Sequence, residues 1–504
     1  MPLFLRLPNE IWALILGFTD LQTLTAVSTT CSHLWAQSVH VLVRHLVWSS
    51  PRVAEQNLSC FWHQFPSKSR AVRSLTFLST PPRIDESIVC EELRSTFDEM
   101  KIFSNGLREL VLCGLTLPSN FFELLEELGR LQQLVVRQCV VPEPPGRLSP
   151  PPRLQKLTVS FLSPIQNKAY SPYFPHLFPD VPFLAIDRDP TAHGPIPVVC
   201  APQKMTMAAD FHEISNPAEH YLSALAHFCL HKLERLEVFS PILYFQPFYV
   251  DPSFFAPWLA GSLPRLQTLL APLSLVRALA RVTKDLRCVA VTGTLCMDAH
   301  IFGLIDDLHQ NGHPLRSLAI VLTSWDDRVL DSIADRFCEL QALEILYLEC
   351  EPELRRFHLP YHQPEPSERL LSTFKTAYLP RLPQLEVLHL HPFPDAIHTF
   401  TGTLRYPAPK KTVGEVATKT VASRLRLVQT IAGTSSLLTR LRLAHDHRAS
   451  QTWVRHALDS PWTPIDEGYD EIQWSSARLV DMNLWATHPI DVYRGGIWST
   501  VFID

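Results

Sequence analysis

The chain has 504 residues, of which 46% are hydrophobic, 45 are basic and 50 are acidic, so its formal net charge is -5. This apolar content supports a large core and argues against global disorder, and the length suits two or more domains or one extended repeat array. The lack of a basic excess argues against a general nucleic-acid-binding role. The 16 glycines form no G-x-G-x-x-G or Walker-type run, which argues against a phosphate-binding loop.

The compartment is predicted from the cysteines and from the apolar runs. The 11 cysteines are scattered and form no C-x-x-C pair, so we expect free, mostly buried thiols of a reducing compartment. No signal peptide is visible, and no apolar run is long enough to span a bilayer. We therefore expect a cytoplasmic or nuclear protein without a membrane partner.

The first forty residues predict three short amphipathic helices. Pro8 and Glu10 are residue types that favour the first turn of a helix, and Ile11 and Ile15 recur at helical spacing. Asp20 is a suitable N-cap for a second helix, and a further apolar stripe follows. So short a segment cannot bury all its apolar faces alone, so the rest of the chain or a partner must cover them.

The order Leu7-Pro8-x-Glu10-Ile11, Ile15-Leu16, Asp20-Leu21-x-x-Leu24 and Val27-Ser28-x-x-Cys31-x-x-Leu34-Trp35 resembles an F-box, over residues 4 to about 48 without gaps. Thr19 departs from the family, which more often has an apolar residue there. The resemblance implies an apolar surface that docks on the Skp adaptor of a cullin-based ubiquitin ligase. The positions that match this surface are Leu7, Pro8, Ile11, Ile15, Leu16, Leu21, Leu24, Val27 and Cys31. The alternative is a helical cap on a repeat domain.

Residues 49–70 are interpreted as a connector, and from residue 71 an L-x-x-L-x-L motif recurs. Each motif predicts a short strand with its last two apolar residues facing inward, and helical patterns separate the motifs, among them 273–282, 298–308 and 326–340. The motifs include Leu107-Leu110-Leu112, Leu131-Leu134-Val136, Leu154-Leu157-Val159, Leu315-Leu318-Ile320, Leu343-Leu346-Leu348, Leu385-Leu388-Leu390, Leu438-Leu441-Leu443 and Leu479-Met482-Leu484.

This series resembles leucine-rich repeats, and the unit Leu131-x-x-Leu134-x-Val136-x-x-Cys139 fits the longer family form. We therefore expect an α/β fold: a three-helix F-box over 1–48, then an irregular leucine-rich-repeat solenoid over 71–504 with parallel strands on the concave side and helices on the convex side. Pro-rich insertions are expected near 140–153, 163–203 and 392–412. An ordinary α/β domain with parallel strands shares the same alternation and is the alternative.

The sequence gives little support for catalysis or for a metal site. His358 and His362 have Pro360 between them, which excludes a shared helical face, and His389 and His391 are expected to be surface residues of one strand. The pairs Asp306-Asp307 and Asp326-Asp327 are interpreted as hydrated helix faces. No G-x-S-x-G or Cys-His signature occurs, so we expect neither an enzyme nor a cofactor.

Protein binding is then the predicted role. The concave face is the usual binding face of such arrays, and aromatic and arginine residues dominate binding hot spots, which favours the C-terminal half. The residues predicted there are Tyr347, Glu349, His389, His391, Arg440, Arg442, Asn483 and Trp485. The favoured interpretation is the substrate-recognition subunit of a Skp-cullin-F-box ubiquitin ligase with an unknown protein substrate. The alternative is a repeat scaffold that joins no ligase.

Overall fold

The computed structural model divides into two compact units, one of residues Met1–Met205 with Ala226–Cys229 and one of Thr206–Leu225 with Leu230–Asp504. The residues that the structure describes are 11–12, 15–16, 18–19, 21–79, 92–137, 139–142, 152–160, 174–187, 200–208, 225, 228–239, 261–291, 298–322, 326–347, 373–392, 428, 431, 437–444, 450–455 and 460–465. Of the expected insertions, most of 140–153 and 393–412 lie outside these residues.

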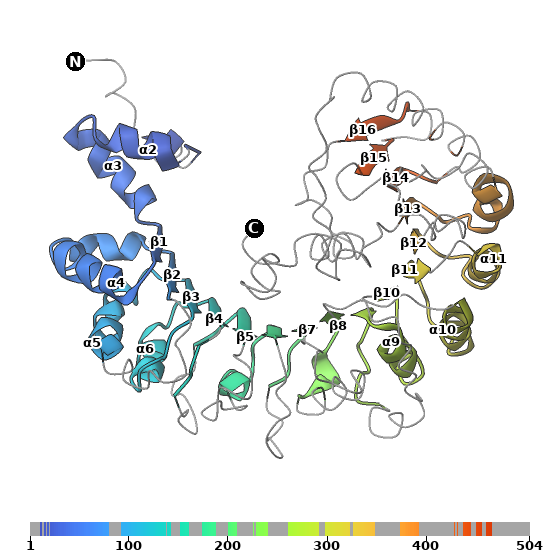
Figure 1. Cartoon of the computed structure of the whole chain (residues 1–504), viewed down its shortest axis with the longest axis horizontal. Coiled ribbons are helices and arrows are strands. Elements are labelled where there is room, and N and C mark those ends of the chain that lie inside the picture. The colour runs from blue at the N-terminus through green and yellow to red at the C-terminus, as the bar shows by residue number, and fades with distance from the viewer. Residues whose placement is uncertain are drawn as a thin grey trace, which may run out of the picture. The chain divides into compact units, whose positions relative to one another are not determined.

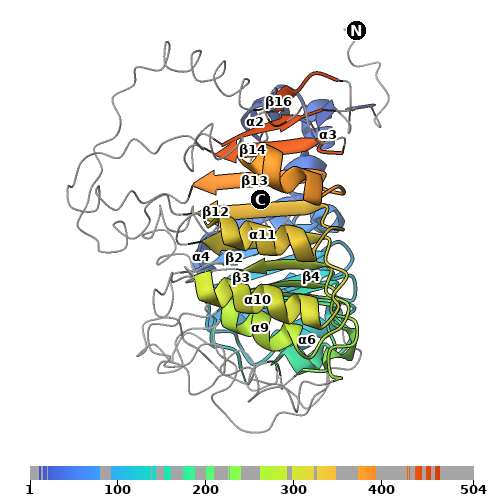
Figure 2. The same ribbon diagram turned by 90° about the vertical axis from the view of Figure 1, so that its right-hand side faces the viewer.

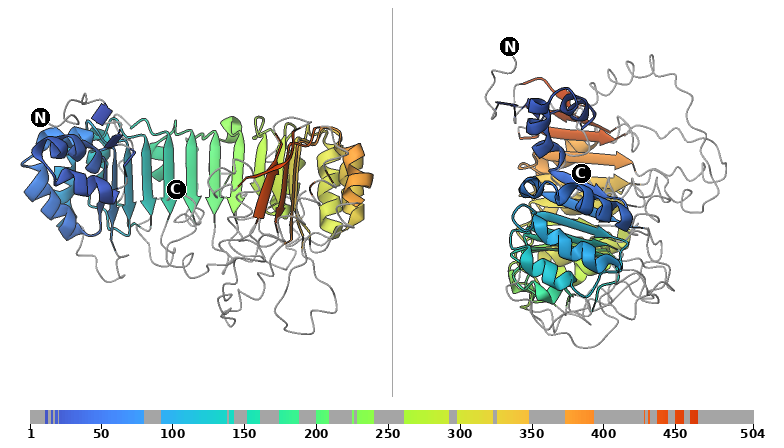
Figure 3. Two further views of the ribbon diagram at one scale, coloured as in Figure 1. Left: turned by 90° about the horizontal axis from the view of Figure 1, so that it is seen from above. Right: turned by 90° about the vertical axis from the view of Figure 1, so that its left-hand side faces the viewer.

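The first unit is an array of parallel strands in chain order, with helices along one face (Figure 1). Strand β1 pairs with β2, and each later strand to β6 pairs with the one before it, always in parallel. Figure 3 shows these strands running side by side. The elements are α2 (Leu21–Ser28), α3 (Ser32–Leu42), β1 (His45–Trp48), α4 (Pro51–Asn57), η2 (Leu58–Trp62), η3 (Pro66–Ala71), β2 (Ser74–Leu78), α5 (Glu92–Glu99), η5 (Met100–Phe103), β3 (Glu109–Cys113), α6 (Phe121–Glu127), β4 (Gln133–Arg137), β5 (Lys156–Ser160), η7 (Phe174–Leu177) and β6 (Phe183–Asp187).

A repeated backbone hydrogen-bond pattern fixes where each strand begins. The carbonyl of the residue before a strand accepts from two successive N–H groups of the next repeat: Arg73 O accepts from Arg108 N at 2.8 Å and from Glu109 N at 3.0 Å. Arg108 O then accepts from Gln132 N and Gln133 N at 2.7 and 2.9 Å. Gln155 O accepts from Phe183 N alone, at 3.3 Å, because Pro182 has no N–H group. These bonds between repeats keep the apolar positions of successive strands in register.

The register places the two strand leucines of each motif in the core. Leu75, Leu110, Leu134, Leu157 and Leu184 are paired along one row, and each is completely buried. Alternate strand residues point to opposite faces, so the residues between the leucines lie on the face opposite the helices. The predicted α/β repeat fold is thereby confirmed.

Residues 49–70, expected as a connector, form helical segments that belong to the array. The strand before them, β1, is in register with β2, so the first motif is Val43-x-x-Leu46-x-Trp48. Trp48 and Trp62 are each 1% exposed. Trp48 packs edge-to-face on Phe77 at 5.6 Å between ring centroids, and Trp62 packs on Phe103 at 5.0 Å. These aromatic contacts place the start of the array within the segment expected to be purely F-box.

A glycine makes the close approach between the first repeats possible. An added Cβ at Gly106 would lie 2.7 Å from the carbonyl oxygens of Arg70 and Val72. These are backbone atoms that cannot rotate away, and the Gly106 carbonyl also accepts from Nη1 of Arg73 at 3.0 Å. Two neighbouring repeats therefore meet at a point where only glycine fits.

The stretch 163–203, expected as a long irregular loop, contains regular structure in its described part. Segment η7 and strand β6 lie within it, and Phe174 and Phe178 are both buried. Strand β7 (Lys204–Ala208) follows, spans the residues where the units divide, and carries the unpredicted motif Pro202-x-x-Met205-x-Met207. Methionine replaces leucine at both inward positions, which are nearly inaccessible, and this substitution hid the repeat.

The second unit repeats the same plan, and α9, α10 and α11 lie along one face of its strands (Figure 2). From β8 to β14, each strand pairs in parallel with the next one along the chain. The expected helices at 273, 298 and 326 are confirmed. The elements are η8 (Leu230–Lys232), β8 (Arg235–Phe239), β9 (Thr268–Ala271), α9 (Leu273–Ala280), β10 (Cys288–Val291), α10 (Asp298–Gln310), β11 (Ser317–Leu322), α11 (Asp327–Arg336), β12 (Ala342–Tyr347), η11 (Phe374–Tyr378), η12 (Leu379–Arg381), β13 (Val387–Pro392), β14 (Arg440–Ala444), β15 (Ser450–Val454) and β16 (Thr463–Ile465).

Ion pairs tie neighbouring helices of this unit together. Asp307 is 7% exposed and accepts from Nε of Arg277 at 2.7 Å and from Nε of Arg281 at 2.9 Å. The Arg277 guanidinium occupies the space where a side chain at Gly303 would begin. The interpretation of Asp307 as a hydrated surface residue is wrong, because its carboxylate joins α9 to α10.

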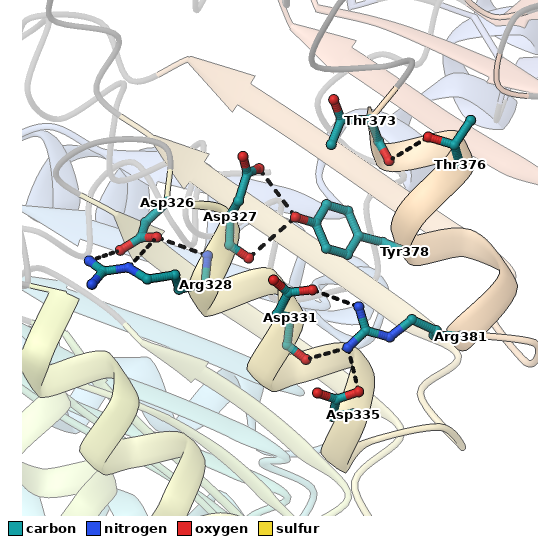
Figure 4. A network of polar contacts seen from close by, with 9 residues as sticks. All are labelled: Asp326, Asp327, Arg328, Asp331, Asp335, Thr373, Thr376, Tyr378 and Arg381. Atoms are coloured by element: carbon teal, nitrogen blue, oxygen red, sulfur yellow. Dashed lines mark hydrogen bonds and ion pairs between the residues drawn. The ribbon is translucent and has the colours of Figure 1, made fainter.

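A second set of polar contacts joins α11 to the segment after it (Figure 4). Arg381 bonds to Asp331 at 2.6 Å and also pairs with Asp335, and the Tyr378 hydroxyl donates to Asp327 Oδ1 at 3.2 Å. Burial, reinforced by the negative charge of Asp327, raises the pKa of Tyr378. The acidic face of α11 is thus occupied by its neighbour.

The parallel order ends at β14, because β15 and β16 pair antiparallel. Trp453 on β15 is 2% exposed and lies opposite Leu441. Arg455 is also buried, with its guanidinium 5.3 Å from the Trp462 ring. Trp453 therefore continues the buried apolar row of β14 onto the antiparallel strand β15.

Candidate functional site

The N-terminal segment presents an apolar stripe to solvent. Ile11, Ile15 and Phe18 are 41%, 45% and 90% exposed. The helical assignments at 11–12 and 15–16 give Ile11 and Ile15 the i, i+4 spacing of one helix side, and Phe18 follows in a turn. In the part of the chain that the structure describes, every prominently exposed large apolar side chain lies between residues 11 and 78. Exposed apolar clusters are a common feature of interaction sites, so this segment is a candidate for one.

The other predicted adaptor-binding residues divide by burial. Leu16 and Leu24 are 2% and 3% exposed, so they hold the helices together and are not part of a docking surface. Cys31 is exposed and Val27 is half-buried. Leu21 begins α2, and Leu7 and Pro8 lie outside the described residues.

An aromatic pair that the sequence did not predict as functional lies on α3 and the segment before η3. Trp35 and Phe65 are 38% and 37% exposed, and their rings meet edge-to-face at 6.2 Å. Phe61 packs on Phe65 at 5.1 Å. The density of aromatic residues between 61 and 65 was the available signal, and it was assigned to the connector.

The predicted strand-face residues of β12 were placed in the wrong frame. Leu343 and Ile345 pair with Leu318 and Ile320, and Leu340, Leu343 and Ile345 are all buried. The motif is therefore Leu340-x-x-Leu343-x-Ile345, three residues earlier than expected, and an odd shift exchanges the two faces of a strand. Tyr347 shares the register row of the buried Leu322, and Glu344 occupies the opposite face. Glu349 lies outside the described residues.

Four of the residues predicted for the binding face, His389, His391, Arg440 and Arg442, lie on β13 and β14. Glu344, His389 and Arg442 follow one another in a single register row of β12, β13 and β14, with His391 and Arg440 on the same two later strands. His389 is only 4% exposed, so its interpretation as a surface histidine is wrong. Asn483 and Trp485 lie outside the described residues, and substrate contact by the set stays a prediction.

Arginines gather where β8, β10 and β11 begin; we call Arg235, Arg287 and Arg316 the arginine cluster. Arg287 and Arg316 directly precede β10 and β11, and Arg316 N donates to Arg287 O at 2.7 Å. The Cys288 thiol lies among them: burial raises its pKa, whereas a hydrogen bond to Thr268 and the charges of all three arginines act to lower it. This cluster was not predicted, because no single repeat displays it.

The three arginines differ in their partners. Arg235 donates from Nε to Glu237 Oε1 at 2.6 Å, and the Thr206 hydroxyl donates to Oε2 of the same completely buried carboxylate at 2.9 Å. Arg287 and Arg316 are exposed, and neither has an ion-pair partner among the residues described. The cluster therefore keeps two uncompensated positive charges.

The described cysteines are free thiols, but only Cys139 and Cys200 among them are buried, whereas Cys31, Cys60 and Cys338 are exposed. The expectation of mostly buried thiols is therefore wrong. Burial raises the pKa of Cys200 to about 12, which makes this thiol unreactive. Within the described ranges, no group of three metal-ligating side chains forms, and no helix has the length and apolar character needed to cross a bilayer.

Comparison with known proteins adds little to this geometry. No family model matches the chain, and no curated protein matches it. Among solved structures, a match is found to a chain of "Crystal structure of TLR13-ssRNA13 complex", at 14% identity and a TM-score of 0.27, covering 64% of this chain. The match covers 41% of that other chain.

Proposed function

We propose that the chain is the substrate-recognition subunit of a Skp-cullin-F-box ubiquitin ligase in the cytoplasm or nucleus. The N-terminal helices dock the Skp-type adaptor, and the leucine-rich-repeat array holds a protein substrate. The chain then contributes proximity, which raises the effective concentration of the substrate at the ligase, and it supplies no bond-making groups.

The observation that supports this proposal is the exposed stripe of Ile11, Ile15 and Phe18 in a segment whose residue order resembles an F-box. Burying one such side chain against a partner contributes about 1.5–3 kcal/mol. The buried Leu16 and Leu24 would keep the helices in place while the stripe faces outward. Cullin would be reached through the adaptor.

Adaptor co-purification tests the proposal. The double substitution Ile11→Asp with Ile15→Asp places two charges in the stripe, so binding to the Skp-type adaptor should be lost while the fold is kept. Leu16→Asp is unsuitable, because that buried side chain supports the fold. The matched control is Val47→Asp with Leu78→Asp, two exposed apolar residues of β1 and β2 outside the stripe, which should bind as the wild type does.

A scaffold that joins no ligase is the second candidate. The observation in its favour is that α3 leads directly into β1, which pairs with β2, as a helical cap of the array would. A wild-type chain that fails to bind the adaptor supports the scaffold. Equal loss of binding in the stripe variant and its control would show instead that the stripe is not the docking surface.

A further inference from the structure

The arginine cluster sets like charges beside each other on neighbouring strands. Cys288 pairs with Ser317 in the β10–β11 register, so Arg287 and Arg316, one residue earlier on each strand, are adjacent as well. Paired parallel strands are about 4.8 Å apart, and like charges placed directly opposite each other on such strands are destabilising. The free protein therefore carries an electrostatic cost at this place that an anion would remove.

The surroundings of the cluster suit a polar, anionic ligand. Beside the arginines, β9, β10 and β11 begin with Thr268, Cys288 and Ser317, which share one register row. These are small side chains with hydrogen-bonding groups. Among the residues that the structure describes, the ion pairs of the cluster involve one carboxylate, that of Glu237, and it is held by Arg235 and Thr206. Arg287 and Arg316 remain exposed beside this row.

We infer that the arginine cluster binds an acidic segment of a partner protein, with a carboxylate of that segment shared between Arg287 and Arg316. Guanidinium groups suit this role because they form paired hydrogen bonds with carboxylates. This deepens the proposed function, since it names the charge class of the substrate segment, and it depends on that function only in calling the partner a substrate.

Fluorescence anisotropy with the purified full chain tests the inference. The probes are a labelled ten-residue peptide of alternating Glu and Ser and its counterpart of alternating Gln and Ser. The wild type should bind the Glu peptide at least tenfold more tightly, a difference of about 1.4 kcal/mol, and added salt should weaken this binding. Arg287→Gln with Arg316→Gln should remove the preference.

The control is Arg52→Gln with Arg70→Gln, which removes the same charge from exposed positions in the helical segments before β2. It should keep the preference for the Glu peptide. Three results would overturn the inference. The wild type could bind both peptides equally, the Arg287 and Arg316 variant could keep its preference for the Glu peptide, or the control could lose that preference to the same extent. Adaptor co-purification of the same variants is a separate readout, so failure of the peptide result and failure of the proposed ligase role remain distinguishable.

Discussion

Several large apolar side chains are exposed in the segment 11–78, whereas those described in the repeats after it are buried or half-buried. Phe18, Trp35 and Val47 in the first segment are 90%, 38% and 62% exposed, whereas Phe97 and Phe121 in the following repeats are completely buried. A repeat between two others has its core covered from both sides, whereas α2 and α3 precede the first strand of the array. The excess apolar surface therefore collects at the N-terminal end of the array.

Charged residues show a similar contrast within the second unit. Asp307 is buried and bound by two arginines, whereas Arg287 and Arg316 are exposed without an ion pair among the described residues. In both contrasts, groups inside the array are satisfied by neighbouring repeats, and unsatisfied groups stand where a partner could reach them. Four predictions test this difference between groups inside the array and groups on its surface.

The largest expected effect separates core from surface aromatic residues. Phe77→Ala removes a fully buried ring that packs on Trp48 and should lower the free energy of unfolding by about 3–5 kcal/mol. Phe18→Ala should change it by less than about 0.5 kcal/mol and affect adaptor binding alone. Urea unfolding followed by circular dichroism measures both, and equal losses of stability would contradict the contrast.

The next effect concerns the carboxylate between α9 and α10. Asp307→Ala leaves Arg277 and Arg281 without their shared partner and should lower the free energy of unfolding by about 3 kcal/mol. Asp285→Ala is the comparison, because Asp285 is an exposed residue of the same unit. If thermal unfolding shows the same fall in melting temperature for both variants, Asp307 contributes no more to stability than a surface charge does.

A smaller effect is expected at the contact between the first repeats. Gly106→Ala would bring a methyl group within 2.7 Å of two backbone oxygens and should lower the free energy of unfolding by about 2 kcal/mol. Gly129→Ala, where no atom lies within 4 Å of the added carbon, is the matched control and should be close to neutral. Comparable melting temperatures for the two variants would contradict the close approach.

The smallest effect depends on pH at the start of α11. The Asp326 side chain caps this helix through Arg328 N at 2.9 Å, and its hydrogen bond to the Arg328 side chain lowers the pKa of Asp326. The folded state therefore favours the carboxylate, so its contribution is complete above the ordinary pKa near 4 and is lost as the pH falls through the lower folded pKa. Asp326→Asn should cost about 0.5 kcal/mol at pH 6, and the difference from wild type should vanish near pH 2. A difference independent of pH would contradict this origin.

The α/β repeat plan could be predicted from local sequence patterns alone. The spacing of Leu110 and Leu112, or of Leu157 and Val159, identifies inward positions because a strand alternates its faces every residue. The helices at 273, 298 and 326 followed from apolar periodicity and from the preceding turn. The same local patterns located Ile11 and Ile15, which the structure leaves exposed.

Contacts between repeats were needed to establish which residues of β12 face inward, where the first strand lies and which partners the charged residues have. The sequence of β12 satisfies two overlapping motifs, Leu340-x-x-Leu343-x-Ile345 and Leu343-x-x-Leu346-x-Leu348, and pairing with β11 chooses the earlier one. Asp307 and Arg287 are both charged residues, yet Asp307 is buried and bound by Arg277 and Arg281, whereas Arg287 is exposed. Such differences arise from contacts between repeats about 30 residues apart, and no pattern within one repeat contains them.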